Sequence, residues 1–276
     1  SIPATPTSSD AVVPLLTPTP IPESINIANV EQVTELQHLG KGVPWQVVWS
    51  PHKKPLLAAA TSLGVYLYDA DTLKEVAFVE HPSPAMSIAF SPDGSVMASG
   101  GEDGVVRLWG VSDNLVREWT GHTREVTSVA ISPDGSLIAS GGVDMAVRLW
   151  RVFDGSLVRE LTGHTDEVWT VAFSPDGSLL ASGGLDATVR LWQVSDGSLV
   201  RELTGHTGEV GSLAFTSYNN RLASMSADGT IRLWRFDDGS LARELTGYSA
   251  PLYSVAYSPD GSLVATGTEG AIYLWR

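Results

Sequence analysis

The sequence contains no cysteine and no long uncharged apolar run, and it is poor in basic residues. Without cysteine the chain can form neither a disulfide framework nor a thiolate metal site. No apolar stretch approaches the roughly 20 residues of a membrane-spanning helix, so direct membrane insertion is not expected. The 17 lysines and arginines are outnumbered by 31 aspartates and glutamates, and the formal charge is −14. Because this charge repels polyphosphate, nucleic acid is not an expected partner.

The sequence does contain a repeat of about 41 residues. The tripeptide "RLW" ends at Trp109, Trp150, Trp192 and Trp234, while "YLY" ends at Tyr68 and "YLW" at Trp275. The steps between these residues are 41, 41, 42, 42 and 41 positions, so six units are present. A period of about 40 to 45 residues with several short strands per unit is typical of propeller blades.

Each unit predicts four strands. In residues 167–203, "EVWTVAFS", "LLASGG", "TVRLWQV" and "LVREL" are separated by the turn sequences "PDGS" and "SDGS" and by a short Asp-containing link. The first three are near-continuous apolar runs, as expected for strands covered on both faces. Arg201 and Glu202 place the fourth strand at a solvated edge. Four-stranded sheets stacked around an axis satisfy this pattern.

The Gly-His, Ser-Pro-Asp-Gly and terminal Trp of these units resemble the WD-repeat β-propeller family, and the near-identical copies resemble its bacterial-type members. The resemblance covers about residues 34–276 and implies an all-β, six-bladed propeller of four-stranded antiparallel blades. It further implies closure by pairing of the N- and C-terminal strands, with "TELQHLG" at residues 34–40 as the closing strand. We therefore expect residues 33–276 to form a monomeric propeller.

Residues 1–32 are predicted to form a flexible Pro/Thr-rich N-terminal segment. Six prolines lie within the first 24 residues. Proline-rich chain favours extended polyproline II and offers little apolar surface to bury. The segment resembles the spacer that follows a signal peptide or lipid anchor in bacterial propellers. This resemblance favours an exported or surface-anchored protein over a cytoplasmic one.

His, Ser and Asp recur at a spacing that raises the question of a hydrolytic triad. The family resemblance instead assigns them, with Trp, to a buried hydrogen-bonded tetrad. Four complete sets are present: His81, Ser99, Asp103 and Trp109; His122, Ser140, Asp144 and Trp150; His164, Ser182, Asp186 and Trp192; and His206, Ser224, Asp228 and Trp234. Catalysis needs one set and not four, so we interpret them as structural. We predict no catalytic residue, no enzyme activity, no metal and no cofactor.

The first and last units lack the complete tetrad. Unit six has Tyr248, Thr266 and Glu269 at these positions, and unit one has Lys41, Ala58, Ser62 and Tyr68. Because these two units flank the closure, we expect the softest part of the ring there. The recurrent Arg-Glu pairs of the fourth strands, from Arg117 with Glu118 to Arg243 with Glu244, are interpreted as surface ion pairs worth about 0 to 1 kcal/mol.

The family resemblance places three positions of each unit at the narrow top of the channel. They are the position five residues after the histidine of Gly-His, where Gln46, Met86, Trp169 and Tyr253 stand, the position two residues before it, and the position before the turn Asp. The predicted partner-binding residues there are Gln46, Met86, Trp169, Tyr253, Leu185, Glu102, Glu125, Glu167 and Glu209. Exposed aromatic side chains in a concave rim are typical anchors for protein partners. The hypothesis is a non-catalytic scaffold for a protein or peptide, for which a basic segment is the natural complement.

Two alternatives stand beside this hypothesis. Trp169 could simply cover a neighbouring blade, with the glutamates as solvated rim residues. Alternatively, Glu125, Glu167 and Glu209 could converge on the channel as a calcium site or as the carboxylates of a propeller enzyme. No Gly-rich phosphate loop or His-pair metal motif supports the second alternative.

Overall fold

The computed structural model describes residues 41–51, 55–110, 115–216, 220–246, 252–258, 261–268 and 271–276. The predicted N-terminal segment and the predicted closing strand at residues 34–40 lie outside these residues, as do Tyr248 and Glu269. All regular secondary structure in the described ranges is β-strand. A search of the same ranges finds no helix with the length and apolarity needed to cross a bilayer.

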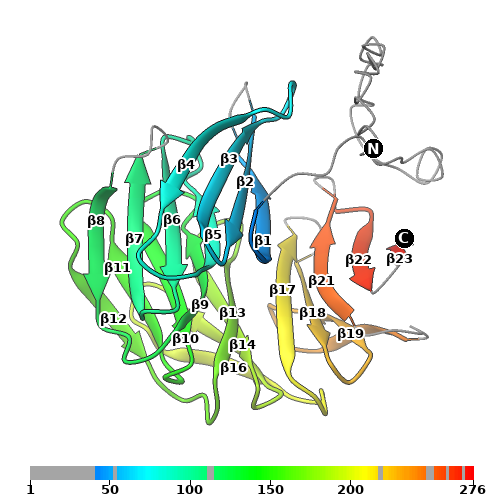
Figure 1. Cartoon of the computed structure of the whole chain (residues 1–276). Helices are drawn as coiled ribbons and strands as arrows, with labels where there is room; N and C mark the ends of the chain where they lie inside the picture. The colour runs from blue at the N-terminus through cyan, green and yellow to red at the C-terminus, as the bar shows by residue number, and fades with distance from the viewer. Residues whose placement is uncertain are drawn as a thin grey trace, which may run out of the picture. The chain divides into compact units, whose positions relative to one another are not determined.

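The strands form six consecutive antiparallel sheets, which we number as blades 1 to 6 (Figure 1). Blade 1 consists of β1 (Pro44–Trp49), β2 (Leu56–Thr61), β3 (Gly64–Asp69) and β4 (Glu75–Glu80). Blade 2 consists of β5 (Ala85–Phe90), β6 (Val96–Gly101), β7 (Val105–Gly110) and β8 (Leu115–Thr120). Blade 3 consists of β9 (Val126–Ile131), β10 (Leu137–Gly142), β11 (Val147–Arg151) and β12 (Leu157–Leu161).

The remaining blades repeat this plan. Blade 4 consists of β13 (Val168–Phe173), β14 (Leu179–Gly184), β15 (Val189–Gln193) and β16 (Leu199–Leu203). Blade 5 consists of β17 (Val210–Thr216), β18 (Arg221–Ser226), β19 (Ile231–Arg235) and β20 (Leu241–Leu245). Blade 6 is described with three strands, β21 (Leu252–Tyr257), β22 (Val264–Thr268) and β23 (Ala271–Trp275).

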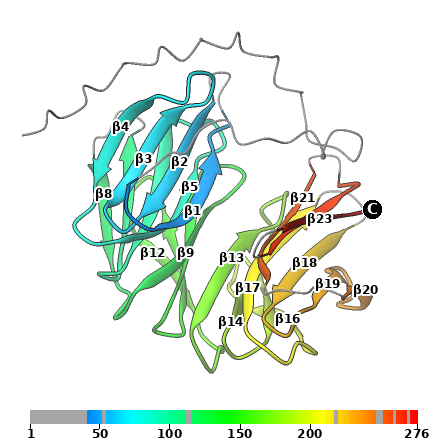
Figure 2. The same cartoon turned by 45° about the vertical axis from the view of Figure 1, so that its right-hand side comes forward.

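Every blade is a meander whose strands pair in chain order. The first strands of successive blades pack against one another in the order β1, β5, β9, β13, β17 and β21, and they form the inner wall of the propeller. Figure 2 shows the neighbouring sheets stacked face to face. The predicted fold class is therefore confirmed: the chain is an all-β, six-bladed β-propeller. Closure by the terminal strands stays a prediction, because the proposed closing strand is not described.

The hydrophobic core lies between blades. Between blades 2 and 3, for example, Val106 and Leu108 pack with Val129 and Ile138, and all four are buried. Equivalent clusters fill the other junctions from blade 1 to blade 6. A blade thus buries an apolar face on each side, which explains why its first three strands lack the alternation of a half-exposed sheet.

Glycines in the second strand allow the sheets to approach closely. A Cβ atom added to Gly100, Gly141 or Gly183 would lie 2.6, 2.7 or 2.7 Å from a valine Cγ1 of the next blade. The three valines are Val126, Val168 and Val210, each fully buried. Any larger residue in place of these glycines would push the next blade away.

The Arg-Glu pairs of the fourth strands were wrongly interpreted as paired with each other. Arg117 donates to the carbonyl of Asp154 in the next blade at 2.9 Å, whereas Glu118 accepts a hydrogen bond from Arg107 at 2.6 Å. Arg159 and Arg201 likewise donate to carbonyls of the following blade, those of Ser195 and Asp237. The physical reason is that adjacent residues of a strand point to opposite faces of the sheet.

Candidate binding surface at the channel mouth

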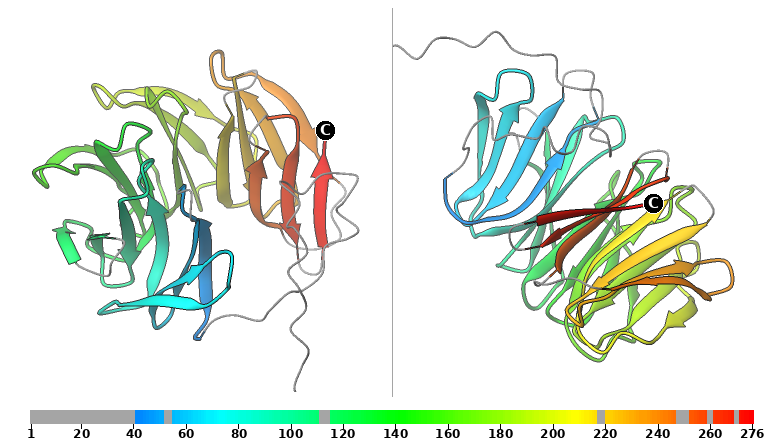
Figure 3. Two further views of the ribbon diagram at one scale, coloured as in Figure 1. Left: turned by 90° about the horizontal axis from the view of Figure 1, so that it is seen from above. Right: turned by 90° about the vertical axis from the view of Figure 1, so that its right-hand side faces the viewer.

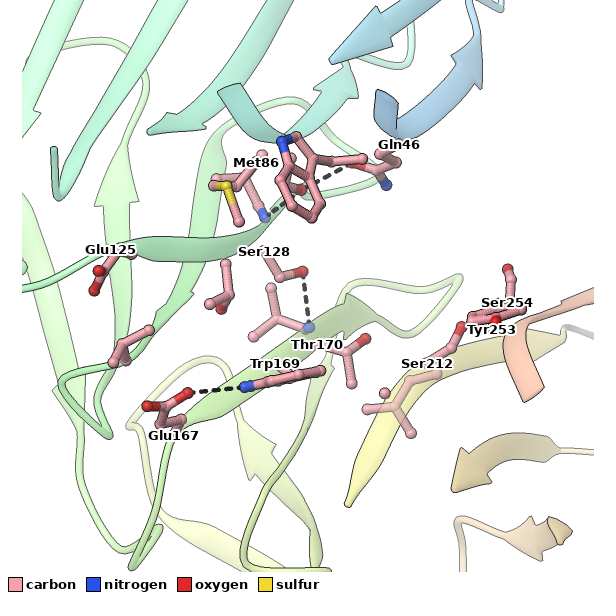
Figure 4. A pocket seen from close by; sticks show the side chains of 18 of the residues that line it. Gln46, Met86, Glu125, Ser128, Glu167, Trp169, Thr170, Ser212, Tyr253 and Ser254 are labelled. Carbon is pink, nitrogen blue, oxygen red and sulfur yellow. Dashed lines mark hydrogen bonds between the residues drawn. The ribbon is translucent and has the colours of Figure 1, made fainter. Parts of the chain in front are cut away.

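A β-bulge interrupts the first hairpin of every blade. In each case one residue of the inner strand is left without a partner in the second strand. These bulge residues are Trp45, Met86, Thr127, Trp169, Gly211 and Tyr253. A bulge re-aims the side chain of the extra residue. All six bulge residues line one pocket with a volume of about 870 Å³ (Figure 4).

Gln46 does not occupy the position that the sequence analysis assigned to it. Gln46 pairs with Ala60, as Ser87 pairs with Gly100, so the counterpart of Met86 is Trp45. The assignment was one residue out because unit one lacks the histidine from which the position is counted. Gln46 still lines the pocket, but its Oε1 accepts hydrogen bonds from Ser87 Oγ at 3.0 Å and from the Ile88 amide at 2.7 Å.

Large aromatic side chains are exposed around this pocket. Trp45, Trp169 and Tyr253 are 54%, 41% and 62% exposed. Trp169 Nε1 donates to Glu167 Oε2 at 3.1 Å, which holds the indole in one orientation. Figure 4 shows Trp169 and Met86 projecting toward the same open space. The pocket therefore presents pre-positioned aromatic surface.

The charged side chains of the pocket are mostly acidic. Glu125 and Glu167 line it, together with Arg124 as the single basic residue among the described lining residues. Arg124 Nε lies 3.7 Å from Glu125 Oε2, and Arg124 Nη1 lies 3.9 Å from Glu167 Oε1. These separations exceed hydrogen-bonding distance, so both carboxylates keep acceptor capacity for another group.

Three of the predicted surface residues do not line the pocket. Leu185, Glu102 and Glu209 are absent from its described lining. In the part of the chain that the structure covers, no three His, Asp or Glu side chains come together closely enough to hold a metal ion. Glu125, Glu167 and Glu209 thus do not form the carboxylate cluster that a calcium site needs.

Side chains of the inner strands tie neighbouring blades together around the channel. Ser87 Oγ accepts a hydrogen bond from the Val129 amide at 3.0 Å, and Ser128 Oγ accepts one from the Val171 amide at 3.1 Å. Ser212 makes the same contact with the Val255 amide at 3.3 Å. The channel wall is therefore braced from blade to blade.

The His, Ser, Asp and Trp of blades 3, 4 and 5 form continuous hydrogen-bonded sets. In blade 3, His122 Nδ1 donates to Asp144 Oδ1 at 2.8 Å, and His122 Nε2 lies 2.7 Å from Ser140 Oγ. Trp150 Nε1 donates to the same Ser140 Oγ at 2.8 Å. The equivalent contacts in blades 4 and 5 join His164, Ser182, Asp186 and Trp192, and His206, Ser224, Asp228 and Trp234.

Blade 2 makes a different set of contacts. His81 Nδ1 donates to the Ser83 carbonyl at 2.7 Å, and Asp103 instead accepts hydrogen bonds from Arg107 at 3.1 and 2.6 Å. Ser99 retains its contacts with His81 at 3.2 Å and with Trp109 at 2.8 Å. All four tetrad serines, Ser99, Ser140, Ser182 and Ser224, have no exposed surface. A substrate therefore cannot reach any of these hydroxyls.

An arginine extends the sets of blades 2, 3 and 4, and the sequence analysis missed it. Arg148 Nη1 lies 2.7 Å from Asp144 Oδ2, and Arg148 Nη2 lies 2.8 Å from Glu160 Oε2. Arg190 makes the same two contacts with Asp186 and Glu202. The signal was present in the sequence as the invariant Arg of the "RLW" tripeptides. These buried charges have partners on both sides, as buried charges require.

The pKa values of the aspartates and of His206 in these sets depend on burial and on the neighbouring hydrogen-bond and charge partners. Burial alone would raise the pKa of Asp144 and Asp186, but hydrogen bonds from histidine and arginine outweigh it and hold both pKa values well below 3.8. In Asp228 burial also acts to raise the pKa, but hydrogen bonds from the Thr207 amide, Thr230 and His206 outweigh it and leave a pKa of about 2. Burial lowers the pKa of His206, and the charge of Arg232 acts in the same direction while Asp228 opposes it.

Blade 1 replaces the polar set by aromatic side chains. Ala59 takes the place of the serine, Tyr66 that of the arginine and Tyr68 that of the tryptophan. Tyr66 packs against Phe78 with 4.6 Å between ring centroids, at the position where blades 2 to 5 have an Arg-Glu pair. The serine position of unit one is thus Ala59 and not Ala58, although neither residue carries a hydroxyl.

Comparison with known proteins agrees with this architecture. Residues 73–110, 113–151, 155–193, 197–235 and 239–276 match the family described as "WD domain, G-beta repeat". The chain is 40% identical over 60 residues to the serine-threonine kinase receptor-associated protein of Homo sapiens, which is 21% of this chain and 17% of that protein. It is 37% identical over 89 residues to the small ribosomal subunit protein RACK1 of Trypanosoma brucei brucei, which is 29% of this chain and 27% of that protein.

A third similarity is to the WD repeat, SAM and U-box domain-containing protein 1 of Danio rerio, at 38% identity over 64 residues, 22% of this chain and 13% of that protein. Each of these matches spans less than a third of the relative. The repeat matches, in contrast, cover more than half of the present chain. Each matched segment holds the fourth strand of one blade and the first three strands of the next, from β4 to β23. The chain belongs to the WD domain, G-beta repeat family.

Proposed function

We propose that the chain is a non-catalytic interaction module that binds an extended protein segment in the pocket at the channel mouth. The observation that carries the proposal is the set of bulge residues from all six blades around this one pocket, with Trp45, Trp169 and Tyr253 exposed. Aromatic anchors in a concave site supply large contact area at low entropic cost. The bracing of the inner strands keeps the site pre-formed, so binding need not order it.

We further propose that the bound segment is basic. The pocket contains two carboxylates and one arginine, and the whole chain carries a formal charge of −14. Such a field attracts cationic partners and repels anionic ones. Lys or Arg side chains of a partner can use the acceptor capacity of Glu125 and Glu167.

The names of two relatives support an interaction role. One is named as a receptor-associated protein and the other as a protein of the small ribosomal subunit. The first name states association with a receptor, and the second states membership of the small ribosomal subunit. On the catalytic side, the four recurring serines are fully buried, so the present chain offers no accessible nucleophile from its tetrads.

The test compares four variants in binding assays with a panel of basic and acidic 12-residue peptides and with proteins captured from cell extract. Trp169→Ala and Tyr253→Ala should each weaken binding about tenfold or more, about 1.4 kcal/mol, because each removes an anchor. Phe153→Ala is the matched control, since Phe153 is 89% exposed but does not line the pocket. Glu167→Gln should weaken binding of basic peptides selectively.

If all variants bound as well as the wild type, the channel mouth would not be the binding site. Preference for acidic peptides would refute the charge assignment while leaving the site intact. Measurement at two salt concentrations separates the electrostatic part, because rim charges lose strength as salt rises.

A further inference from the structure

Arg124 lies between two carboxylates of the pocket at the channel mouth. Its Nε is 3.7 Å from Glu125 Oε2, and its Nη1 is 3.9 Å from Glu167 Oε1. Glu125 precedes β9 of blade 3 and Glu167 precedes β13 of blade 4, so one guanidinium lies near carboxylates from two blades (Figure 3). Both separations are longer than a hydrogen bond. Arg124 therefore contributes positive charge at this place without a hydrogen bond to either carboxylate.

The carboxylate of Glu125 has an oxygen that lacks a donor. Oε2 is buried and has no hydrogen-bond partner among the described residues. A buried acceptor without a donor destabilises the structure that contains it. A charge-assisted hydrogen bond to this oxygen would measure about 2.8 Å, which is shorter than its present distance from Arg124 Nε. The position of Arg124 is thus suited to a cation that fits more closely than Arg124 does.

The blade does not need an arginine at this position. Arg124 stands two residues after His122, and the residues two positions after the histidines of blades 2, 4 and 5 are Ser83, Asp166 and Gly208. The side chain of Arg124 is 56% exposed, and ion pairs at such exposure contribute little to stability. We therefore look for the role of Arg124 in the pocket and not in the packing of the blade.

The backbone on both sides of Arg124 is fixed. The Thr123 amide donates to Asp144 Oδ2 at 3.1 Å, and the Val143 amide donates to the Glu125 carbonyl at 3.0 Å. Arg124 can thus leave the carboxylates by rotation of its side chain alone, without opening the loop. Rotation into solvent would clear the space beside Glu125 Oε2.

Glu167 is held independently of Arg124. Its carbonyl accepts a hydrogen bond from the Leu185 amide at 2.9 Å, and its Oε2 accepts one from Trp169 Nε1 at 3.1 Å. Figure 4 shows Glu125 and Glu167 at the same side of the pocket. One oxygen of Glu167 therefore orients the indole, while the other, Oε1, is the one nearest to Arg124 and can accept from a cation.

We propose that Arg124 is an internal competitor, which occupies the place of an arginine side chain of the bound partner. This inference rests on the proposed function of the pocket. When the partner binds, Arg124 rotates into solvent, and the partner's guanidinium donates to both Glu125 Oε2 and Glu167 Oε1. A guanidinium suits this place because its planar fork carries donors in several directions, whereas the ammonium of lysine is a compact point charge.

Competition of this kind lowers the apparent affinity for the partner. A site that is open for only a fraction of the time binds with an affinity reduced by that fraction. Removal of the competitor should therefore strengthen the binding of an arginine-containing segment, although the variant loses a side chain from the pocket. This effect is opposite in sign to that of removing an anchor such as Trp169.

The test uses isothermal titration calorimetry with an acetylated 12-residue peptide of alternating arginine and glycine. Arg124→Ala should bind this peptide about fivefold more tightly than the wild type does. The same peptide with citrulline in place of arginine keeps the shape without the charge, so it should bind weakly and gain nothing from the substitution. A peptide with lysine in place of arginine should bind more weakly than the arginine peptide to both chains.

Two comparisons separate local competition from a change in net charge. Arg151→Ala removes the same charge from a side chain that is 51% exposed and does not line the pocket, so it should change the affinity by less than about twofold. The gain from Arg124→Ala should also disappear when Glu125 and Glu167 are both changed to glutamine, because the competitor then has no carboxylate to occupy.

Unchanged or weaker binding by Arg124→Ala would overturn the proposal, and weaker binding would identify Arg124 as a contact for the partner. An equal gain from Arg151→Ala would attribute the effect to net charge alone. Equal affinity for the lysine and arginine peptides would refute the assignment to a guanidinium.

The Trp169→Ala variant distinguishes a failure of the proposed function from a failure of this inference. If Trp169→Ala binds the arginine peptide as well as the wild type does, the pocket is not the binding site. If Trp169→Ala loses affinity while Arg124→Ala gains none, the pocket is the site and only the competitor role of Arg124 is refuted.

Discussion

At the scale of single residues, the recurring His, Ser and Asp are the residue types of a hydrolytic triad. In this molecule they are buried and satisfy one another's hydrogen bonds. Ser140 Oγ contacts the imidazole of His122 and accepts from the indole of Trp150, and it has no exposed surface. Hydrogen-bonding geometry alone would suit a nucleophile with its base. Burial decides against that role, because neither a substrate nor water can reach the oxygen.

The first prediction concerns this hydroxyl. Ser140→Ala leaves His122 Nε2 and Trp150 Nε1 without their partner and should lower the free energy of unfolding by about 1 to 3 kcal/mol. Urea denaturation measures this loss. The matched control is Thr266→Val in blade 6, where the buried Oγ1 has no hydrogen-bond partner among the described residues. Thr266→Val should be neutral or slightly stabilising, and a loss equal to that of Ser140→Ala would refute the assignment.

The second prediction concerns pH. The pKa values of His81 and His206 are lowered below 6.5, chiefly by burial, so the unfolded chain binds protons that the folded chain does not. The free energy of unfolding should therefore fall as pH drops below about 6.5. Below pH 4 a further loss should follow, because Asp144, Asp186 and Asp228 are charged in the fold and their pKa values are depressed.

Urea melts at intervals from pH 8 to pH 3 check both stages. The variant His206→Gln should show a shallower decline between pH 6.5 and pH 5 than the wild type. Stability that rises on acidification through this range would show that the histidines are protonated in the fold.

At the scale of strands, the alternation of side chains assigns different tasks to neighbouring residues. In β12, Glu160 faces the buried Arg148 of its own blade, whereas Arg159 reaches the Ser195 carbonyl of the next blade. The fourth strand is therefore both an edge and a connection between blades. The inner strands of blades 1, 2, 3 and 5 have a similar division, because the bulge residue lines the pocket while the next residue accepts a hydrogen bond from the neighbouring inner strand.

The third prediction concerns the connection made by the fourth strand. Arg201→Ala removes the hydrogen bond to the Asp237 carbonyl, which measures 2.7 Å, and should lower the free energy of unfolding by about 1 kcal/mol. Arg235→Ala, which changes an exposed arginine of β19, is the control and should stay within about 0.5 kcal/mol of the wild type. Equal losses from the two variants would mean that the contact between blades contributes nothing measurable.

At the scale of the whole molecule, stability depends on blade-to-blade contact. Blades 3 and 4 have a filled junction on each side and complete polar sets. Among the described residues, blade 1 has a filled junction toward blade 2, while Val47 and Trp49 on its opposite face are exposed. Repeat architectures gain most of their stability from such interfaces, so a blade with one open face is held less firmly.

The fourth prediction follows from this difference. In native-state hydrogen exchange, the amides paired between β1 and β2 should exchange before those between β9 and β10 or between β13 and β14. Mass spectrometry of proteolytic fragments distinguishes these regions. Protection of blade 1 equal to that of blades 3 and 4 would show that the open face does not weaken it.

The sequence predicted much of the architecture, because the same order of strands and turns recurs in all six units. The period of the "RLW" tripeptides and the four apolar runs per unit predicted six four-stranded blades, since blade-on-blade packing requires apolar residues on both faces. Prediction was weakest in unit one, where Lys41 replaces the histidine. There the counterpart of Met86 was taken as Gln46 when it is Trp45, because this position lies in a β-bulge, whose place depends on strand pairing and not on counting along the sequence.

The sequence by itself determined the number of blades and the strands within them. Only the tertiary structure decided which side chains meet around the pocket and which apolar faces remain uncovered. The physical reason is that strand patterns are local, whereas exposure depends on what lies against a face. Gly267 and Gly183 occupy the same position of the same repeat, yet one faces open space and the other a valine 2.7 Å from its added Cβ.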